Sequence, residues 1–272
     1  MKLSMMSYTM ACQPEFFSLD AMFDLTVELK LDGIDIVTLY DRTAAELRKM
    51  ADDHGIPVVC HTFFSPLDVA AAVSDGHAVD VAKRSIEDAV VLGAPTVMIP
   101  TLNNAKLPRD KARTAWIKGL NKVMPFAKQA DVNLTIENFP GENSPFVTSA
   151  DFLTAAAEVD GLKLTYDNGN AATGENPAES FTRCFDYIVH AHFKDWDIID
   201  TPANGYSRML DGRYYQPALV GEGNVDQAGC LKVMKSSGYS GYINIEYEGN
   251  KYRPDEAVRR AVDYLRKLYI KV

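Results

Sequence analysis

The chain has 272 residues, a length that suits one α/β barrel of about 250 residues. Hydrophobic residues make up 47% and charged residues 24%, as in ordinary soluble globular domains. The formal net charge of −9 argues against a nucleic-acid partner, because a phosphate backbone requires a basic surface, and it favours a small polar substrate.

Short β-rich runs alternate with longer helical patterns along the whole chain. In chain order, strands are predicted at Leu3–Met6, Gly33–Leu39, Pro57–Thr62, Thr96–Pro100, Asn133–Asn138, Leu162–Asp167, Tyr187–Lys194 and Tyr242–Tyr247. Helices are predicted between and after them, at Leu19–Lys30, Ala44–His54, Ser74–Leu92, Lys111–Ala130, Ser149–Val159, Pro177–Arg183, Val225–Ser237 and Asp255–Ile270.

This alternation predicts parallel βαβ units, and eight such units favour one α/β (β/α)₈ TIM barrel over residues 1–272. A doubly wound open sheet is the alternative fold, but its G-x-G-x-x-G nucleotide fingerprint does not follow the first strand. A long stretch without predicted structure runs from Asp195 to Gly221. It follows the seventh strand, on the catalytic face of a barrel, so we expect a functional loop there.

Ionisable residues lie near the C-terminal ends of four successive predicted strands. Glu137 ends NLTIE, Asp167 ends LKLTYD, His192 lies in YIVHAHF, and Glu246 lies in YINIEYEG. Each residue alone has an ordinary explanation, such as a helix cap, an Asx turn or a hydrogen-bonded core residue. The C-terminal ends of barrel strands share one face, however, so the four side chains are expected to converge there.

We therefore predict that Glu137, Asp167, His192 and Glu246 bind a divalent metal ion. Three crowded carboxylates would repel one another strongly without a cation. Three oxygen donors and one imidazole suit Mn²⁺ or Mg²⁺, with Co²⁺ and Zn²⁺ as alternatives, and the lack of thiolates argues against a structural zinc site. His190 shares a strand face with His192 but is expected one layer deeper, as a hydrogen-bonded core residue.

Six further residues are candidates for substrate binding: His61, Glu142, Asn170, Lys194, Trp196 and Arg213. His61 ends the third strand, and its alternatives are a second metal site or a capped loop. Lys194 is expected to polarise a carbonyl or bind an anion, or else to pair with Asp195. Trp196 is expected either to stack on a sugar ring or to anchor the loop, and Arg213 is the best basic candidate for a substrate phosphate.

The four cysteines are widely spaced and form no C-x-x-C pair, so they are expected to be reduced and structural. The start, MKLSMMSYTM, lacks the features of a secretory signal, and no stretch approaches the roughly 20 apolar residues of a membrane-spanning helix. These features predict a cytoplasmic protein without a membrane partner, and they leave a homo-oligomer open.

Several segments resemble the sugar phosphate isomerase/epimerase family, the xylose-isomerase-like TIM barrels. They are TIENFPG, LTYDNGN, HAHFKD, GEGNVD and GYSGYINIEYEG. The resemblance implies a single-metal site at the four ligands named above, with Glu137 and Glu246 also acting as the catalytic acid/base pair of the epimerase branch. That branch has a His where this chain has Asn170, and an Arg where it has Ile198, so the resemblance leaves the substrate open.

The resulting hypothesis is a metal-dependent isomerase or epimerase acting on a ketose, a sugar phosphate or a related polyol ketone, by proton abstraction and an enediolate intermediate. An inosose-type dehydratase on the same fold is the alternative. An AP endonuclease-like nuclease is less favoured, because that branch needs several additional His ligands and the chain has five His in total. A sugar-binding barrel without turnover is the remaining alternative.

Overall fold

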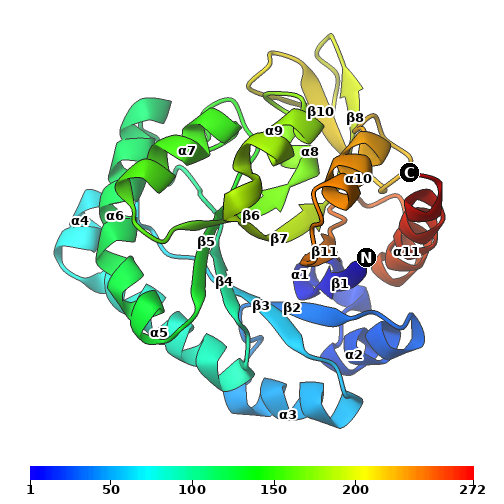
Figure 1. Cartoon of the computed structure of the whole chain (residues 1–272), viewed down its shortest axis with the longest axis horizontal. Helices are drawn as coiled ribbons and strands as arrows, with labels where there is room; N and C mark the ends of the chain where they lie inside the picture. The colour runs from blue at the N-terminus through cyan, green and yellow to red at the C-terminus, as the bar shows by residue number, and fades with distance from the viewer.

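The computed structural model describes residues 1–272 and shows a closed barrel of eight parallel strands (Figure 1). Around the barrel the strands are β1 (Lys2–Met6), β2 (Gly33–Val37), β3 (Val58–Thr62), β4 (Thr96–Ile99), β5 (Asn133–Glu137), β6 (Lys163–Asp167), β7 (Ile188–Phe193) and β11 (Tyr242–Ile245). Pairing of β11 with β1 closes the ring. The predicted (β/α)₈ barrel is therefore confirmed, and all eight predicted strands are present.

Helices surround the strands (Figure 1). They are α2 (Leu19–Glu28), α3 (Ala44–His54), α5 (His77–Leu92), α6 (Arg109–Gln129), α7 (Ser149–Glu158), α9 (Pro177–Cys184), α10 (Gln227–Ser236) and α11 (Pro254–Lys271). Shorter pieces that were not predicted are α1 (Ser7–Ala11), α4 (Ala70–Ser74), α8 (Asn168–Ala171) and the 3₁₀ turns η1 (Pro14–Phe16) and η2 (Phe185–Tyr187). The helix predicted over Ser74–Leu92 is present as α5, but it begins three residues later, at His77, because Gly76 takes a φ of +87° and separates α4 from α5.

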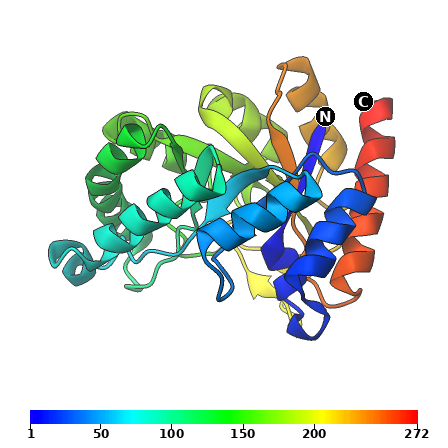
Figure 2. The same cartoon turned by 90° about the horizontal axis from the view of Figure 1, so that it is seen from below.

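The prediction of an irregular loop from Asp195 to Gly221 is also wrong. This segment contains β8 (Asp195–Ile199), β9 (Ser207–Arg208) and β10 (Tyr214–Ala218), which form a three-stranded antiparallel sheet. Trp196, Met209, Tyr215 and Val225 form a small apolar cluster of their own under this sheet. The sheet lies at the opposite end of the molecule from the two chain termini (Figure 2).

Polar side chains occupy positions inside the barrel. Asp35, Cys60, His190 and Asn244 are almost completely buried, although they alternate along their strands with apolar residues such as Ile243. The alternation points the apolar residues of each strand outward to the helices and the polar ones inward. The barrel interior is therefore a place where buried polar groups must find partners in one another or in a ligand.

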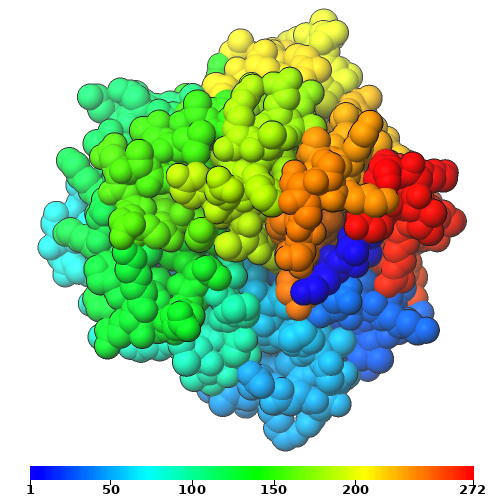
Figure 3. Space-filling view, in the orientation of Figure 1, coloured from blue at the N-terminus to red at the C-terminus, as the bar shows by residue number.

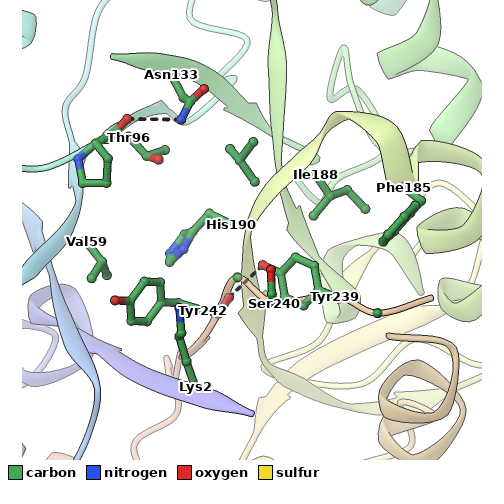
Figure 4. A pocket seen from close by; sticks show the side chains of 14 residues that line it. Lys2, Val59, Thr96, Asn133, Phe185, Ile188, His190, Tyr239, Ser240 and Tyr242 are labelled. Atoms are coloured by element: carbon green, nitrogen blue, oxygen red, sulfur yellow. Dashed lines mark hydrogen bonds between the residues drawn. The ribbon is translucent and has the colours of Figure 1, made fainter. Parts of the chain in front are cut away.

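The strands begin at the end of the molecule that carries the chain's first residues. In the space-filling view of this end, these residues lie beside the segment leading into β11, in agreement with the pairing of Lys2 and Tyr242 (Figure 3). A cavity of about 340 Å³ opens here, with Lys2, Asn133, His190 and Tyr242 among its lining residues (Figure 4).

No helix is both long enough and apolar enough to cross a bilayer.

Candidate active site

Four strands bring the predicted metal ligands to one place. Glu137 ends β5, Asp167 ends β6, His192 lies in β7, and Glu246 directly follows β11. One ligand atom from each residue lies within 4.8 Å of those of the others. All four side chains are buried. The expected convergence of these residues is thus present in the structure, and together they could hold a metal ion.

His192 is the centre of this group. Its Nδ1 atom lies 2.6 Å from Oε1 of Glu137 and 3.2 Å from Oε2 of Glu246. Its Nε2 atom faces away from both, at 3.6 Å from Oδ2 of Asp35. Burial opposes a charged imidazole, but the surrounding carboxylates outweigh burial and raise the pKa of His192 well above its ordinary value. The ring therefore presents Nδ1 to the glutamates of the group.

The three carboxylates differ in their electrostatic surroundings. Burial, together with repulsion from Glu246 and Glu137, raises the pKa of Asp167 well above its ordinary value. Burial also raises the pKa of Glu137, although His192 opposes this. The pKa of Glu246 is instead lowered, to about 2, because the attraction of Lys194 and His192 outweighs the effect of burial.

The donor set fits a divalent cation. Oδ2 of Asp167 is buried without a hydrogen-bond partner, and Oε2 of Glu246, although 3.2 Å from Nδ1 of His192, makes no contact with hydrogen-bond geometry; both conditions are rare for polar atoms in folded proteins. Carboxylate oxygens and an imidazole nitrogen are ligands that Mn²⁺, Mg²⁺ and Zn²⁺ accept. A cation would also offset the crowding of negative charge that raises the pKa of Asp167.

Lys194 supports the group from one side. Its Nζ atom lies 2.8 Å from Oε1 of Glu246 and 2.9 Å from Oε2 of Glu248, and its side chain is buried. Its backbone N–H donates to Oδ1 of Asn168 at 3.1 Å. The alternative pairing of Lys194 with Asp195 does not occur, because the Asp195 carboxylate accepts backbone N–H groups from the turn that follows β10.

A cavity of about 190 Å³ reaches Glu137 and Glu246. The first half of the chain contributes a mainly apolar wall, made of Met6, Tyr8, Val37, Thr62, Phe64, Met98, Pro100 and Leu102. The second half contributes Phe139 and three carboxylates, those of Glu137, Glu246 and Glu248. The cavity thus has one apolar wall and one acidic wall, and its size suits a small molecule.

The other residues predicted to bind substrate lie at different distances from this cavity. Asn170 is fully buried beside Asp167, to whose Oδ1 it donates its backbone N–H at 2.6 Å, and both polar atoms of its side chain lack partners. His61 does not line the cavity, and its Nδ1 lies 3.0 Å from the carbonyl oxygen of Ile36. Glu142 is exposed and forms an ion pair with an arginine of β9.

Trp196 lies in β8 and Arg213 directly precedes β10, and neither lines the cavity. The Trp196 ring packs edge-to-face on Tyr215, with ring centroids 6.1 Å apart, so it anchors the sheet. The Arg213 guanidinium pairs with Asp211, with Nε 2.7 Å from Oδ2, and lines a separate surface cavity.

Two residues that the sequence analysis did not single out also belong to the site. Glu248 lines the cavity and contacts Lys194. Asp35 lies behind His192, within the strand GIDIV, whose other residues are apolar or glycine. A charged residue within an apolar strand was the signal for Asp35. For Glu248, which follows β11, the signal was the alternation that it shares with Asn244 and Glu246.

Comparisons with known proteins agree with the fold. The family described as xylose isomerase-like TIM barrel matches residues 23–268. An inosose dehydratase of Lacticaseibacillus casei is 27% identical over 153 residues, which cover 54% of this chain and 51% of that protein. The match therefore spans about half of the length of this relative.

Two solved structures are similar over nearly their whole length. The IolI protein with a bound zinc atom has a TM-score of 0.82 at 19% identity, and the alignment covers 100% of this chain and 99% of that one. An L-ribulose 3-epimerase has a TM-score of 0.79 at 17% identity, with 100% and 95% covered. At such identities the likeness concerns the fold alone.

Proposed function

Because the chain belongs to the xylose isomerase-like TIM barrel family, we propose that it is a metal-dependent isomerase or epimerase of a ketose or related polyol ketone. One observation carries the proposal. Glu137 and Glu246 reach the same cavity from two different strands, within a group of buried side chains suited to a cation. The family includes enzymes that act on sugars, and the zinc-bound IolI structure has the same fold.

A divalent cation held by Glu137, Asp167, His192 and Glu246 would act as a Lewis acid on the substrate carbonyl and acidify the neighbouring C–H bond. The protein's own residues then divide the proton transfers. We assign the removal of the proton, which leaves an enediolate, to Glu137, which reaches the cavity from the end of β5. A proton is then returned in one of two ways: Glu137 gives its proton to the adjacent carbon, or Glu246, after taking up a proton from solvent, protonates the other face.

The cavity favours a substrate without phosphate. None of its lining residues is a lysine or an arginine. The buried ammonium of Lys194 already contacts Glu246 and Glu248. Barrels often bind phosphate at a short extra helix after the seventh and eighth strands, whereas here the chain runs from β11 to α11 at Pro254 without such a helix. An uncharged polyol ketone with an apolar edge matches the two walls.

The test is exchange of substrate hydrogen with deuterium from solvent, followed by NMR for a panel of ketoses, ketose phosphates and inososes with Mn²⁺. The wild-type protein should exchange one C–H position of its substrate, and Glu137→Gln and Glu246→Gln should each abolish the exchange. The exposed carboxylate of Glu158 in α7 provides the control, and Glu158→Gln should behave as wild type. Full exchange in both site variants would refute the assignment.

A dehydratase is the second candidate, favoured by the similarity to inosose dehydratase. The first step would be the same removal of a proton next to the ketone. The electron pair would then expel a hydroxyl group from the next carbon. This hydroxyl group takes up a proton and leaves as water. Ultraviolet absorbance of the unsaturated ketone distinguishes the two reactions, because isomerisation and epimerisation produce no such absorbance.

A further inference from the structure

A buried carboxylate lies behind the candidate ligands, on the side away from the substrate cavity. Asp35 of β2 is 0% exposed and does not line that cavity. Its Oδ2 atom lies 2.6 Å from Nε2 of His190 and 3.6 Å from Nε2 of His192. Its Oδ1 atom lies 3.4 Å from the hydroxyl of Ser4. Asp35 therefore sits between two imidazoles, one of which belongs to the candidate metal site.

Two irregularities of strand register place this carboxylate. Between β2 and β3 the register shifts after Ile34, so that Asp35 pairs with Cys60. Between β6 and β7 it shifts before Thr165, so that Thr165 pairs with His190. A bulge re-aims side chains and commonly occurs next to functional sites. One shift thus occurs at Asp35 itself, and the other occurs beside His190, its ion-pair partner.

The orientation of His192 depends on what its second nitrogen contacts. With Nδ1 facing the glutamates, Nε2 points into the barrel, where it is buried and has no hydrogen-bond partner. Asp35 is the carboxylate within 4.0 Å of this atom. A histidine that ligates a metal usually donates its other N–H to a carboxylate, which fixes its tautomer and its ring orientation. A small movement of either side chain would bring Asp35 into hydrogen-bond range.

His190 holds Asp35 from the opposite side. Its ring lies perpendicular to that of His192, at 89° and with centroids 5.3 Å apart. It also lines the cavity at the N-terminal end of the barrel, where Figure 4 shows it among Val59, Thr96 and Tyr242. His190 and His192, two residues apart on one strand, thus face opposite ends of the barrel with Asp35 between them.

We propose that Asp35 is a positioning residue, which holds the ring of His192 so that Nδ1 faces the metal, and that His190 anchors Asp35 for this task. The proposal rests on the metal site of the proposed function and deepens it. Asp35, Cys60 and His190 could instead form a second metal site, since their ligand atoms also lie within 4.8 Å of one another. Positioning is favoured because Nε2 of His190 is already engaged with Asp35 at 2.6 Å, whereas Nε2 of His192, 3.6 Å from the same carboxylate, has no partner.

The test compares metal affinity with metal-free stability in Asp35→Asn, a variant of nearly unchanged size. The dissociation constant for Zn²⁺ or Mn²⁺, measured by competition with a chelator, should rise about 10–100-fold. Ser4→Ala is the matched control, because it removes the other neighbour of the Asp35 carboxylate and should leave affinity unchanged. His190→Gln should also weaken metal binding, because Asp35 would lose its anchor.

A spectroscopic measurement keeps the proposal testable if Asp35→Asn does not fold. In the zinc-loaded wild-type protein, ¹⁵N NMR should show His192 protonated at Nε2 and bound to metal through Nδ1. Wild-type affinity in Asp35→Asn, with or without a lower melting temperature, would overturn the proposal. So would an unprotonated Nε2, or two bound metals of which Cys60→Ser loses one. A wild-type chain that binds no divalent metal would instead overturn the proposed function.

Discussion

Replacing Asp167 with asparagine should stabilise the metal-free protein and remove its response to metal. The ionised form of Asp167 is disfavoured by burial and by the carboxylates of Glu246 and Glu137, so keeping it charged near neutral pH costs folding free energy. Asparagine keeps the size of the side chain. It also preserves the N-cap of α8, in which Oδ1 accepts the N–H of Asn170 at 2.6 Å.

The expected size follows from the unpartnered oxygen. A buried acceptor without a hydrogen bond costs about 1–3 kcal/mol, and Oδ2 of Asp167 is such an atom. Asparagine replaces this oxygen with an N–H donor that faces the carboxylates of Glu137 and Glu246, whose ligand atoms lie within 4.8 Å of that of Asp167. At about 2–4 °C per kcal/mol for a chain of this size, relief of about 1 kcal/mol raises the metal-free melting temperature by about 2–4 °C. Metal at 100 times its dissociation constant stabilises the wild type by about 2.7 kcal/mol, or about 5–11 °C, and the variant should lose most of this gain.

The pH dependence supplies a second check. The unfolded carboxyl ionises near pH 4, whereas the folded one retains its proton to higher pH because its pKa is raised. The folded state then holds more protons, so wild-type stability falls as pH rises above about 4 until the folded carboxyl also ionises. The advantage of Asp167→Asn should therefore be absent in acid and grow toward neutrality.

Thermal unfolding of both proteins from acid to neutral pH, with EDTA and with Mn²⁺, measures the metal-free melting temperature, its rise with metal and its dependence on pH. The reasoning would be refuted if the metal-free variant melted below the wild type at pH 7. It would also be refuted if metal raised both melting temperatures equally, because Asp167 would then contribute nothing to the binding of the cation.

Three other predictions follow from contacts of the same region and from the cysteines. Lys194→Met leaves the buried Glu246 carboxylate without its ammonium partner, so denaturant unfolding should show a loss of about 3–5 kcal/mol, and an unchanged midpoint would contradict this. Trp196→Ala should cost about 3–5 kcal/mol and make the three-stranded sheet the first site of proteolysis; cleavage elsewhere would argue against its anchoring role. Reducing agent should leave the unfolding midpoint unchanged, because all four cysteines are free, whereas a shift would reveal a disulfide.

The barrel could be predicted because each of its strands is a short apolar run between helical patterns. The ends of helices were also predictable where the chain carries a strong stop, such as Gly55 with a φ of +67° after α3. The three-stranded sheet was not, since β9 has only two residues, β8 and β10 mix polar and apolar residues, and the sheet packs on an apolar cluster that includes Trp196, Met209 and Val225. Such a cluster joins positions far apart in sequence, and no local pattern reveals it.

The convergence of the four candidate ligands was predictable for a different reason. A charged residue in an apolar strand is conspicuous, and the parallel order of a barrel places all strand ends on one face. Asp35 carries the same signal, but its importance depends on β2 and β7 facing each other across the barrel interior. The positions of Trp196 and Arg213 depend in turn on the three-stranded sheet, so their distance from the cavity required the structure.

The two walls of the cavity come from different halves of the polypeptide. Residues before α6 supply the apolar wall, and residues from β5 onward supply every carboxylate that reaches the cavity. Selection for a new substrate can therefore act on the first half of the gene while the second half keeps its chemistry intact. The short turn between Gln129 and Asn133, which joins the halves, is a natural crossover point for recombination between related genes.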